Sequence, residues 1–518
     1  MFCQGHRATI LLGMNRRDFI RSAGAAAGIA ALGQIGWADS SASGGPNILV
    51  LYADQHNAGV LGCAGHPDVK TPHMDRLASE GVRFNRAYCQ DGVCVPSRAS
   101  MMTGQYCRTI GVLDNSRWKK GPESFLPLAQ YLQSKGYRTA AFGKRHMPRT
   151  LDIGFDRTCS TLDPKNEPSD EHYWDWVKDQ GQYDAFMRDW MGEQGKGRSS
   201  PMGSHVSELK PENTMEAYTA RKTIDFLREA GKQKKPFFCW TSFLRPHQPY
   251  TPPKQYADMY DQAKIQLPAS LYERPENLPP GLKRLRYHEE PPWCLAKAAR
   301  DISLYRRYIA YYYALVTEVD HHIGSIMEVL RKEGLDRDTI VIYTSDHGDF
   351  VGAHGMIEKS AQAHNVYEDT LRVPLIIRPA VAEAMAGRWP TRLRKNAVSD
   401  DLIELIDLYP TLLDLAGVER PKDYRLPGRS LVSTLKDGKA VGRDFAISES
   451  LSQVSIITPR HKLGVWIKPQ ADGYGDMLFD RERDPYETHN FAGDPEYAEV
   501  EKQLRGQLKQ WESSVSLA

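Results

Sequence analysis

Short apolar runs that end in an ionisable residue alternate with helical segments along this chain, and this alternation restricts the fold most strongly. The clearest run, NILVLYA at residues 47–53, is closed by Asp54. Its length and its β-forming side chains favour a buried strand over a helix. Four further runs of this kind occupy residues 137–142, 236–243, 339–344 and 373–377. The pattern predicts an α/β fold whose mostly parallel central sheet is covered by helices on both faces.

The helical segments between these runs vary in length. Residues 125–135 have helical spacing, residues 302–331 predict one long helix, and residues 401–417 read as a shorter amphipathic helix. The apolar spacing of the long segment indicates core packing for its five central tyrosines. These are Tyr305, Tyr308, Tyr311, Tyr312 and Tyr313.

The pattern changes near Arg443 to short β-like runs, which are followed by an amphipathic segment at about residues 496–511. A chain of 518 residues is long for one core, and a large domain with an appendage fits that length. We therefore expect a catalytic α/β domain at residues 47–440. Residues 441–518 are expected to form a smaller C-terminal α+β subdomain, an antiparallel sheet with a terminal helix.

The first 38 residues resemble a twin-arginine export signal. Arg16 and Arg17 precede a weakly apolar stretch rich in alanine and glycine, and small residues lead to a cleavage position near Ala38. Met14 is an alternative start to Met1. The stretch is too short to span a bilayer in the mature protein. The expected location is therefore the periplasm or the exterior of the cell.

The net charge limits the expected binding partners, and the cysteine count limits the possible disulfide pairing. Lys and Arg number 67 against 65 Asp and Glu, a net charge of +2, so no strong field draws the protein to nucleic acid or to an anionic membrane. Cys3 leaves with the signal, and the odd number of cysteines that remains leaves one unpaired if the others form disulfides. Neither a CxxC motif nor a zinc spacing occurs in the sequence.

Ionisable residues follow four of the predicted strands. In parallel sheets, ligands bind beyond the carboxyl ends of the strands. Distant segments therefore bring these groups to one edge of the sheet, where we expect a shared site. The residues are Asp54, Lys144, His247 and the pair Asp346 and His347.

Cys94 opens the segment CVPSR, just before an expected helix at residues 99–103. A helix start favours a negative charge, and Arg98 adds a bidentate donor suited to sulfate or phosphate oxygens. These features predict a low-pKa nucleophile beside an anion site. A buried structural cysteine is the alternative.

The segment CVPSR, continued by ASMMTG, resembles the signature of the type I sulfatases, which belong to the alkaline phosphatase superfamily. Each such motif is weak alone, but six more motifs stand along the chain in the family's order. They are TPHMDRLA at 71–78, GKRH at 143–146, PHQPY at 246–250, SDHG at 345–348, DLYPT at 407–411, and LFD with DPYE within 478–487. The resemblance covers roughly residues 47–500 and implies an alkaline phosphatase-like fold.

The resemblance implies that a formylglycine-generating enzyme converts Cys94 to formylglycine (3-oxoalanine) before export. In that family one hydroxyl of the hydrated aldehyde attacks sulfur, and the other expels inorganic sulfate by C–O cleavage. A divalent metal is also implied. Calcium is expected and manganese is the alternative, because Gln55 and His347 stand where many relatives carry Asp and Asn. The implied ligands are Asp54, Gln55, Cys94, Asp346 and His347.

The same resemblance assigns catalytic roles. Arg98 and Lys144 would stabilise the charged hydrate and the sulfate oxygens. His146 would hydrogen-bond residue 94, and His247 would protonate the leaving oxygen. Lys359 matches the family's second sulfate-binding lysine, although its context IEK departs from the family's W-x-K pattern.

The substrate is less defined. A sulfated carbohydrate or another sulfated small molecule is expected. A phosphonate monoester or phosphodiester hydrolase, a choline-sulfatase-like enzyme and a catalytically inactive metal- or glycan-binding protein are the alternatives. Five residues near the catalytic segments either line a polar sugar pocket or are ordinary loop residues: His56, Asp114, Asn115, Trp118 and His354. The sugar, its linkage, the endo or exo mode, the oligomeric state and the disulfide pairing remain open.

Overall fold

The computed structural model describes most of the chain after the predicted signal. The described residues are 45–115, 125–149, 151, 153–194, 203–233, 235–272, 277–287, 302–359, 366–380, 394–467 and 473–516. Residues 42–518 belong to one compact unit. The signal at residues 1–38 and Trp118 lie outside the described ranges, and the boundary at residue 440 stays a prediction.

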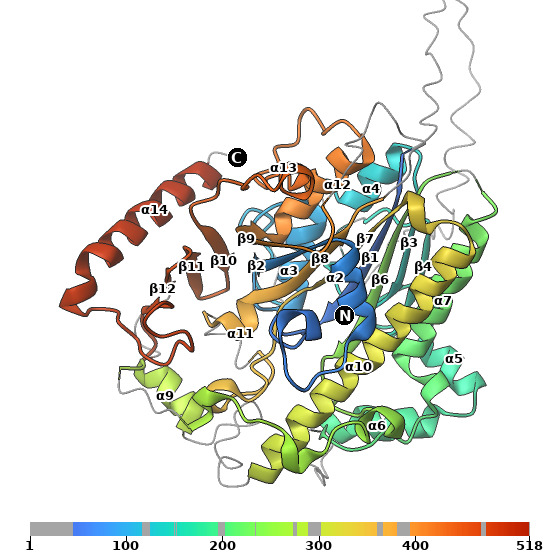
Figure 1. Cartoon of the computed structure of the whole chain (residues 1–518), viewed down its shortest axis with the longest axis horizontal. Coiled ribbons are helices and arrows are strands. Elements are labelled where there is room, and N and C mark those ends of the chain that lie inside the picture. Colours follow the sequence, from blue (N-terminus) through green and yellow to red (C-terminus); the bar gives the residue numbers. More distant parts are fainter. Residues whose placement is uncertain are drawn as a thin grey trace, which may run out of the picture. The chain divides into compact units, whose positions relative to one another are not determined.

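The largest element is a nine-stranded sheet at the centre of the protein (Figure 1). In spatial order its strands are β5 (Glu171–His172), β4 (Arg157–Ser160), β3 (Arg138–Gly143), β6 (Phe237–Pro246), β1 (Asn47–Asp54), β7 (Thr339–Ser345), β8 (Arg372–Arg378), β2 (Val82–Tyr88) and β9 (Ala397–Glu404). Strand β8 runs antiparallel to both of its neighbours, and the remaining pairs are parallel. The predicted mostly parallel sheet is confirmed, and all five predicted strands lie in it.

The direction of β8 follows from the segment that leads into it. A parallel return needs a crossover of a dozen or more residues that passes over the sheet, usually as a helix. Between β7 and β8 the described residues contain only two short elements, a 3-10 turn at Ala353–Gly355 and helix α11 (Glu368–Leu371). The chain therefore re-enters the sheet from the edge at which β7 ends.

Helices cover both faces of the sheet, because successive residues of β1 point to opposite sides. Val50 and Tyr52 pack in a core with α3, α4 and α12, whereas Leu49 and Leu51 pack in a core with α2, α7 and α10. Helices α7 and α10 run side by side on the second face (Figure 1). The bounds are α2 Pro72–Glu80, α3 Cys94–Thr103, α4 Leu128–Ser134, α7 Met215–Ala230, α10 Ile302–Lys332 and α12 Leu408–Ala416.

Shorter helices accompany these two layers. They are α5 (Tyr173–Asp179), α6 (Tyr183–Gln194), α8 (Lys254–Ala257), α9 (Pro280–Tyr287) and α13 (Val432–Asp437). None of the described helices combines the length and the apolar character that crossing a lipid bilayer requires.

The predicted helix at residues 401–417 is wrong in its first part. Residues up to Glu404 complete strand β9, and α12 begins only at Leu408. Leu402 and Ile403 pair with β2, so contacts with a distant strand override the local helical pattern. The helix predicted at residues 99–103 begins earlier than expected, at Cys94 itself.

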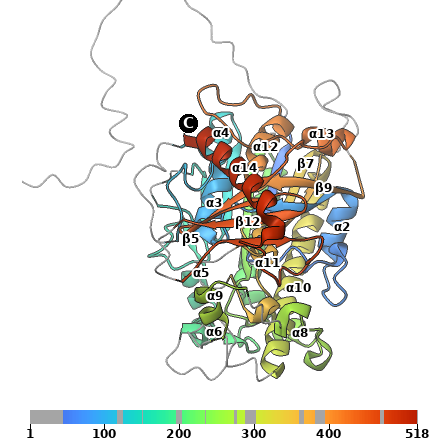
Figure 2. The ribbon, with the colours of Figure 1, turned by 90° about the vertical axis from the view of Figure 1, so that its left-hand side faces the viewer.

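The C-terminal part forms the expected antiparallel sheet with a terminal helix (Figure 2). Its strands are β10 (Ala446–Glu449), β11 (Gln453–Ile457), β12 (His461–Trp466) and β13 (Met477–Asp480), and the helix is α14 (Ala498–Ser516). Leu504, Leu508 and Trp511 of α14 pack on the apolar side chains of this sheet. Backbone N–H groups of Ile447 and Glu449 donate to Glu404 and Gln90, which joins β10 to the main sheet's segments.

A buried ion cluster also ties this C-terminal sheet to α11. Lys462 of β12 is fully buried and pairs with Glu368, at 3.3 Å, and with Glu487, at 2.5 Å. Arg481 lies 2.7 Å from Glu368. Burial raises the pKa of Glu368, but Lys462 and Arg481 outweigh it and lower that pKa to about 2.

Replacing Glu368 with glutamine is therefore expected to destabilise the protein in a pH-dependent way. A carboxyl whose pKa is depressed on folding contributes stability above its unfolded pKa and loses it as the pH falls toward 2. We expect the free energy of unfolding to fall by about 2 kcal/mol at pH 7 and by much less near pH 3, measured by urea titration. Glu482→Gln is the control, because the pair of Glu482 with Arg460 is exposed. An equal loss for Glu368→Gln at both pH values would contradict this account.

Candidate active site

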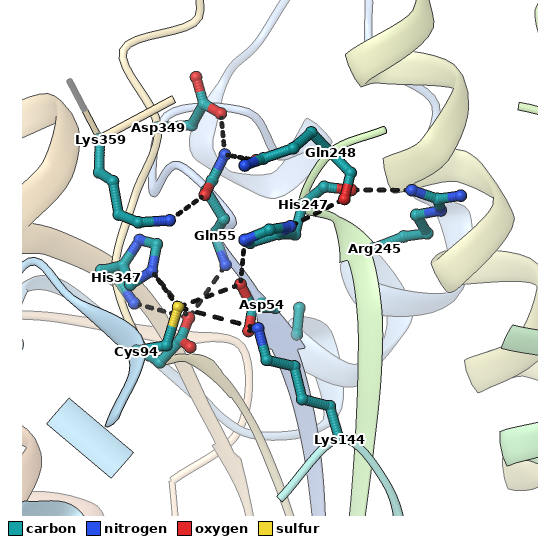
Figure 3. Close-up of polar contacts among 12 residues, drawn as sticks. Asp54, Gln55, Cys94, Lys144, Arg245, His247, Gln248, His347, Asp349 and Lys359 are labelled. Atoms are coloured by element: carbon teal, nitrogen blue, oxygen red, sulfur yellow. Dashed lines mark hydrogen bonds and ion pairs between the residues drawn. The ribbon is translucent and has the colours of Figure 1, made fainter. Parts of the chain in front are cut away.

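The ionisable residues that follow β1, β3, β6 and β7 converge at one edge of the sheet, around the sulfur of Cys94 (Figure 3). Asp54 ends β1, Lys144 follows β3, and the pair Asp346 and His347 follows β7. Tyr52 pairs with Ser242 and with Thr344, and Ser242 pairs in turn with Gly143, so the ends of β1, β3, β6 and β7 lie side by side. The predicted shared site is thus one cluster of side chains.

Cys94 is the first residue of α3, and the extended backbone of Val93 places it at the helix N-terminus. Its side chain is 1% exposed. The sulfur lies 3.2 Å from His347 Nε2, 3.8 Å from Asp54 Oδ1 and 3.8 Å from Lys144 Nζ. Cys94 is one of six described cysteines, which are all free thiols, and Cys294 lies outside the described residues.

Arg98 lies one helical turn after Cys94 and is fully buried. Its Nη2 is 2.7 Å from Asp54 Oδ2, and its Nε is 2.7 Å from Asp346 Oδ2. Its Nη1 donates to the Lys144 carbonyl at 2.8 Å. Arg98 therefore bridges the carboxylates of Asp54 and Asp346. Its predicted contact with the sulfate oxygens stays a prediction.

The charges around position 94 favour an anion there. Burial raises the pKa of the Cys94 thiol, but Lys144, Lys359 and His347 together lower it well below its usual value. Burial and Cys94 also push the pKa of Asp54 upward, yet Lys144, at 2.6 Å, His247 and Arg98 hold it below its usual range. A negatively charged atom on residue 94 is thus stabilised by positive neighbours, despite its burial.

Four of the predicted ligands also form a group that fits a metal ion. One donor atom from each of Asp54, Cys94, Asp346 and His347 lies within 4.8 Å of the other three. The two carboxylates supply oxygen donors of the kind that calcium and manganese accept, and the imidazole adds a nitrogen donor. His347 Nδ1 lies 2.9 Å from the Gly348 carbonyl, so Nδ1 carries a proton and Nε2 is the atom that faces the cluster.

Gln55, the fifth predicted ligand, meets the cluster through its backbone. Its N–H donates to Asp346 Oδ1 at 2.9 Å, and its positive φ of 66° turns the side chain toward Lys359. The amide oxygen accepts from Lys359 Nζ at 3.0 Å, and the amide nitrogen donates to Asp349 at 2.7 Å. Lys359 thus reaches the site as predicted, and metal ligation by the Gln55 side chain stays a prediction.

Two histidines complete the predicted set. His146 lies close enough to Cys94 to help lower the pKa of its thiol. His247 places Nε2 3.9 Å from Asp54 Oδ1, and its Nδ1 lies 2.8 Å from the Gln248 carbonyl. Because a carbonyl only accepts, Nδ1 carries the proton and Nε2 is the atom that faces the site. Burial and Lys144 lower the pKa of His247 to about 4.

Two buried carboxylates near the site were not predicted. Asp349, just after the SDHG segment, accepts from Gln55, from Tyr308 and from the Val351 N–H. Glu167 accepts the backbone N–H groups of Arg145 and His146 and so supports the turn that carries His146, whose φ is 46°. Proximity to SDHG is a usable signal for Asp349, whereas no local pattern indicates Glu167.

The candidate sugar-pocket residues that the structure describes have partners within the protein. His56 bonds Tyr343 and the Val60 carbonyl, and burial lowers its pKa to about 4. Asn115 accepts the Val95 N–H at the start of α3. His354 is 2% exposed, with its ring 4.4 Å from that of Tyr367, and Asp114 also has interaction partners. The tyrosines of α10 are core residues, as predicted.

Comparisons with known proteins agree with this geometry. The Sulfatase family model matches residues 46–418, and the model of the N-sulphoglucosamine sulphohydrolase C-terminal region matches residues 352–514. An arylsulfatase of Clostridium perfringens is 29% identical over 89% of this chain and 93% of its own. An N-acetylglucosamine-6-O-sulfatase of Bacteroides thetaiotaomicron is 27% identical over 90% of this chain and 86% of its own.

Among solved structures, the phosphonate monoester hydrolase of Agrobacterium radiobacter superposes with a TM-score of 0.73 and 25% identity, covering 91% of this chain and 96% of that one. The chain belongs to the sulfatase family, within the alkaline phosphatase superfamily. It is an enzyme of the sulfuric ester hydrolase class. The family resemblance and the enzyme class predicted from the sequence are confirmed.

Proposed function

We propose that this enzyme is an exported sulfatase that hydrolyses sulfate esters of carbohydrates. Residue 94, converted to formylglycine, would be its nucleophile. The observation that carries the proposal is the convergence of two carboxylates, two lysines and three histidines on the buried Cys94. A hydrated formylglycine supplies one hydroxyl for attack on sulfur and a second whose ionisation releases sulfate.

Asp54, Asp346 and His347 would hold the divalent cation, with Gln55 as a further candidate. A bound cation supplies positive charge that lowers the cost of an anionic oxygen on residue 94. Calcium is proposed because Asp54 and Asp346 supply carboxylate oxygens. Manganese is the alternative because His347 adds a nitrogen donor. Arg98 holds both carboxylates in place.

The remaining side chains would handle charge and protons. Lys144 and Lys359 carry positive charge on two sides of residue 94, where they neutralise the sulfate oxygens. His247 presents Nε2 to the site and, once that nitrogen is itself protonated, would donate the proton to the leaving oxygen of the sugar. His146 would hydrogen-bond residue 94 and take the proton of its second hydroxyl.

A carbohydrate substrate is supported by the similarity to the N-acetylglucosamine-6-O-sulfatase. The second candidate is phosphonate monoester or phosphodiester hydrolysis, which the structural similarity to the phosphonate monoester hydrolase favours. Gln55 and His347 also support it. Gln55 replaces the Asp that many relatives carry and so lowers the negative charge of the ligand set, and His347 replaces Asn and adds a nitrogen donor. Sulfate monoesters, phosphonate monoesters and phosphodiesters each carry one negative charge, so relative rates on matched esters, and not the charge of the substrate, separate the two candidates.

Relative rates on matched esters test the proposal. The modified enzyme is given 4-nitrophenyl sulfate, 4-nitrophenyl phosphate and 4-nitrophenyl phenylphosphonate, together with defined sulfated mono- and disaccharides. We expect the highest kcat/KM among the 4-nitrophenyl esters for the sulfate, and release of sulfate from at least one glucosamine sulfate. A higher kcat/KM for the phosphonate would replace this function with the second candidate.

Export through the twin-arginine signal is part of the proposal. Formylglycine formation would precede export, since this route carries folded proteins. Changing Arg16 and Arg17 together to lysine is expected to keep the enzyme in the cytoplasm, as measured by activity in cell fractions. Undiminished periplasmic activity in that variant would exclude this route.

A further inference from the structure

Arg245 is a buried arginine that does not face the reacting centre. It lies at the end of β6, two residues before His247, and is 8% exposed. Figure 3 shows its guanidinium behind the backbone of His247, on the side away from Cys94. Its charge is therefore placed to hold the protein chain.

The guanidinium binds three oxygens of the loop that carries His247. Nη1 donates to the His247 carbonyl at 3.0 Å and to the Pro249 carbonyl, and Nη2 donates to Thr251 Oγ1 at 3.0 Å. The planar fork of arginine can supply these donors from one rigid group, whereas the point charge of lysine cannot. Both carbonyls that flank Gln248 are thereby fixed.

The anchor of Arg245 is itself fixed from the other side. Glu216 of α7, 1% exposed, accepts the Arg245 N–H at 3.1 Å and lies 3.9 Å from its Nε. Glu318 of α10 lies close enough to interact with Glu216 and Arg245. Arg245 thus connects the His247 loop to two long helices of the protein core.

The imidazole direction of His247 depends on this loop. Its Nδ1 bonds the carbonyl of Gln248, the residue between the two carbonyls that Arg245 holds. A shift of that carbonyl would rotate the ring and move Nε2 relative to Asp54 and residue 94. Efficient proton transfer needs the donor within hydrogen-bonding distance of the leaving oxygen.

We infer that Arg245 is a positioning residue for His247, which sets where the proton is delivered to the leaving oxygen. This inference rests on the proposed role of His247 as general acid. The leaving group separates such a role from a purely structural one. 4-Nitrophenolate leaves well without a proton, whereas a sugar alkoxide leaves only when protonated.

The test compares Arg245→Lys with the wild type on 4-nitrophenyl sulfate and on a sugar sulfate that the enzyme hydrolyses. We expect kcat on the sugar sulfate to fall by about 10-fold to 100-fold, and kcat on 4-nitrophenyl sulfate to fall by less than about 3-fold. His247→Gln is the reference and should show the same selectivity with a larger loss, about 100-fold or more. Thr251→Val, which removes one of the three acceptors, should shift the ratio in the same direction, even if Arg245→Lys fails to fold.

Arg443→Lys is the matched control. Arg443 is likewise buried and pairs with Glu404 and Asp407, but it lies in the segment that leads into β10. It should lose stability with no change in the ratio of the two rates. Equal losses on both substrates for Arg245→Lys, beside a selective loss for His247→Gln, would overturn the inference alone. If His247→Gln is not selective either, the proposed role of His247 fails, and the inference with it.

Discussion

Replacing Cys94 with alanine is expected to lower sulfate ester hydrolysis by about 10,000-fold or more while the fold is retained. The sulfur is the atom on which His347, Asp54 and Lys144 converge, and no other described nucleophilic side chain lies at that point. Alanine removes the atom that conversion to formylglycine requires. Lys144, Lys359 and the histidines remain, so binding of the sulfate group should survive.

Stability should change little in this variant. Alanine suits the first turn of a helix, and Cys94 contributes mainly charge contacts that raise the pKa of the buried Asp54. Cys239→Ala is the control, because its buried thiol lies in β6 and contacts Thr241. That variant should keep the wild-type turnover. Kinetics on 4-nitrophenyl sulfate and thermal unfolding of both variants measure these effects. A Cys94→Ala enzyme that kept a tenth or more of the wild-type turnover would refute the proposal that residue 94 is the nucleophile.

Removing the proposed divalent cation with a chelator is expected to reduce turnover by about 100-fold or more, with a smaller effect on folding. The carboxylates of Asp54 and Asp346 would repel each other without a counter-charge. Arg98 supplies that charge at 2.7 Å from each, so the arrangement survives without the metal. Binding of the ion then adds stability that grows with the logarithm of its free concentration, about 2.7 kcal/mol at 100 times the dissociation constant.

Adding back calcium or manganese at stated free concentrations identifies the ion, with turnover and Tm followed together. Asp346→Asn should bind the ion more weakly, so its restored turnover should need a higher concentration. Glu482→Gln, an exposed carboxylate far along the chain from the cluster, should titrate like the wild type. Full turnover by protein that elemental analysis finds free of divalent metal would exclude the metal role.

Much of the fold was predictable because it depends on local patterns. The run at residues 47–53 is apolar on both faces, and it lies at the centre of the sheet between β6 and β7. Strand β2 was missed because VRFNRAY mixes polar with apolar residues. The local pattern of residues 401–404 predicts a helix, because it does not reveal the pairing with β2 that makes these residues a strand. Periodicity reports which face of an element is buried, but not which distant segment covers it.

The candidate site divides in the same way. The sequence alone determined the chemical types of the groups and their order: a cysteine before a helix, carboxylates and bases at strand ends, and the family that this order defines. Only the tertiary structure decided that Arg98 bridges two carboxylates, that Gln55 turns toward Lys359, and that Arg245 holds the His247 loop. The physical reason is that hydrogen bonds and ion pairs depend on ångström-scale distances between segments that lie far apart in the chain, such as Gln55 and Lys359, which are 304 residues apart. Strand order and loop direction create those distances, and no local pattern encodes them.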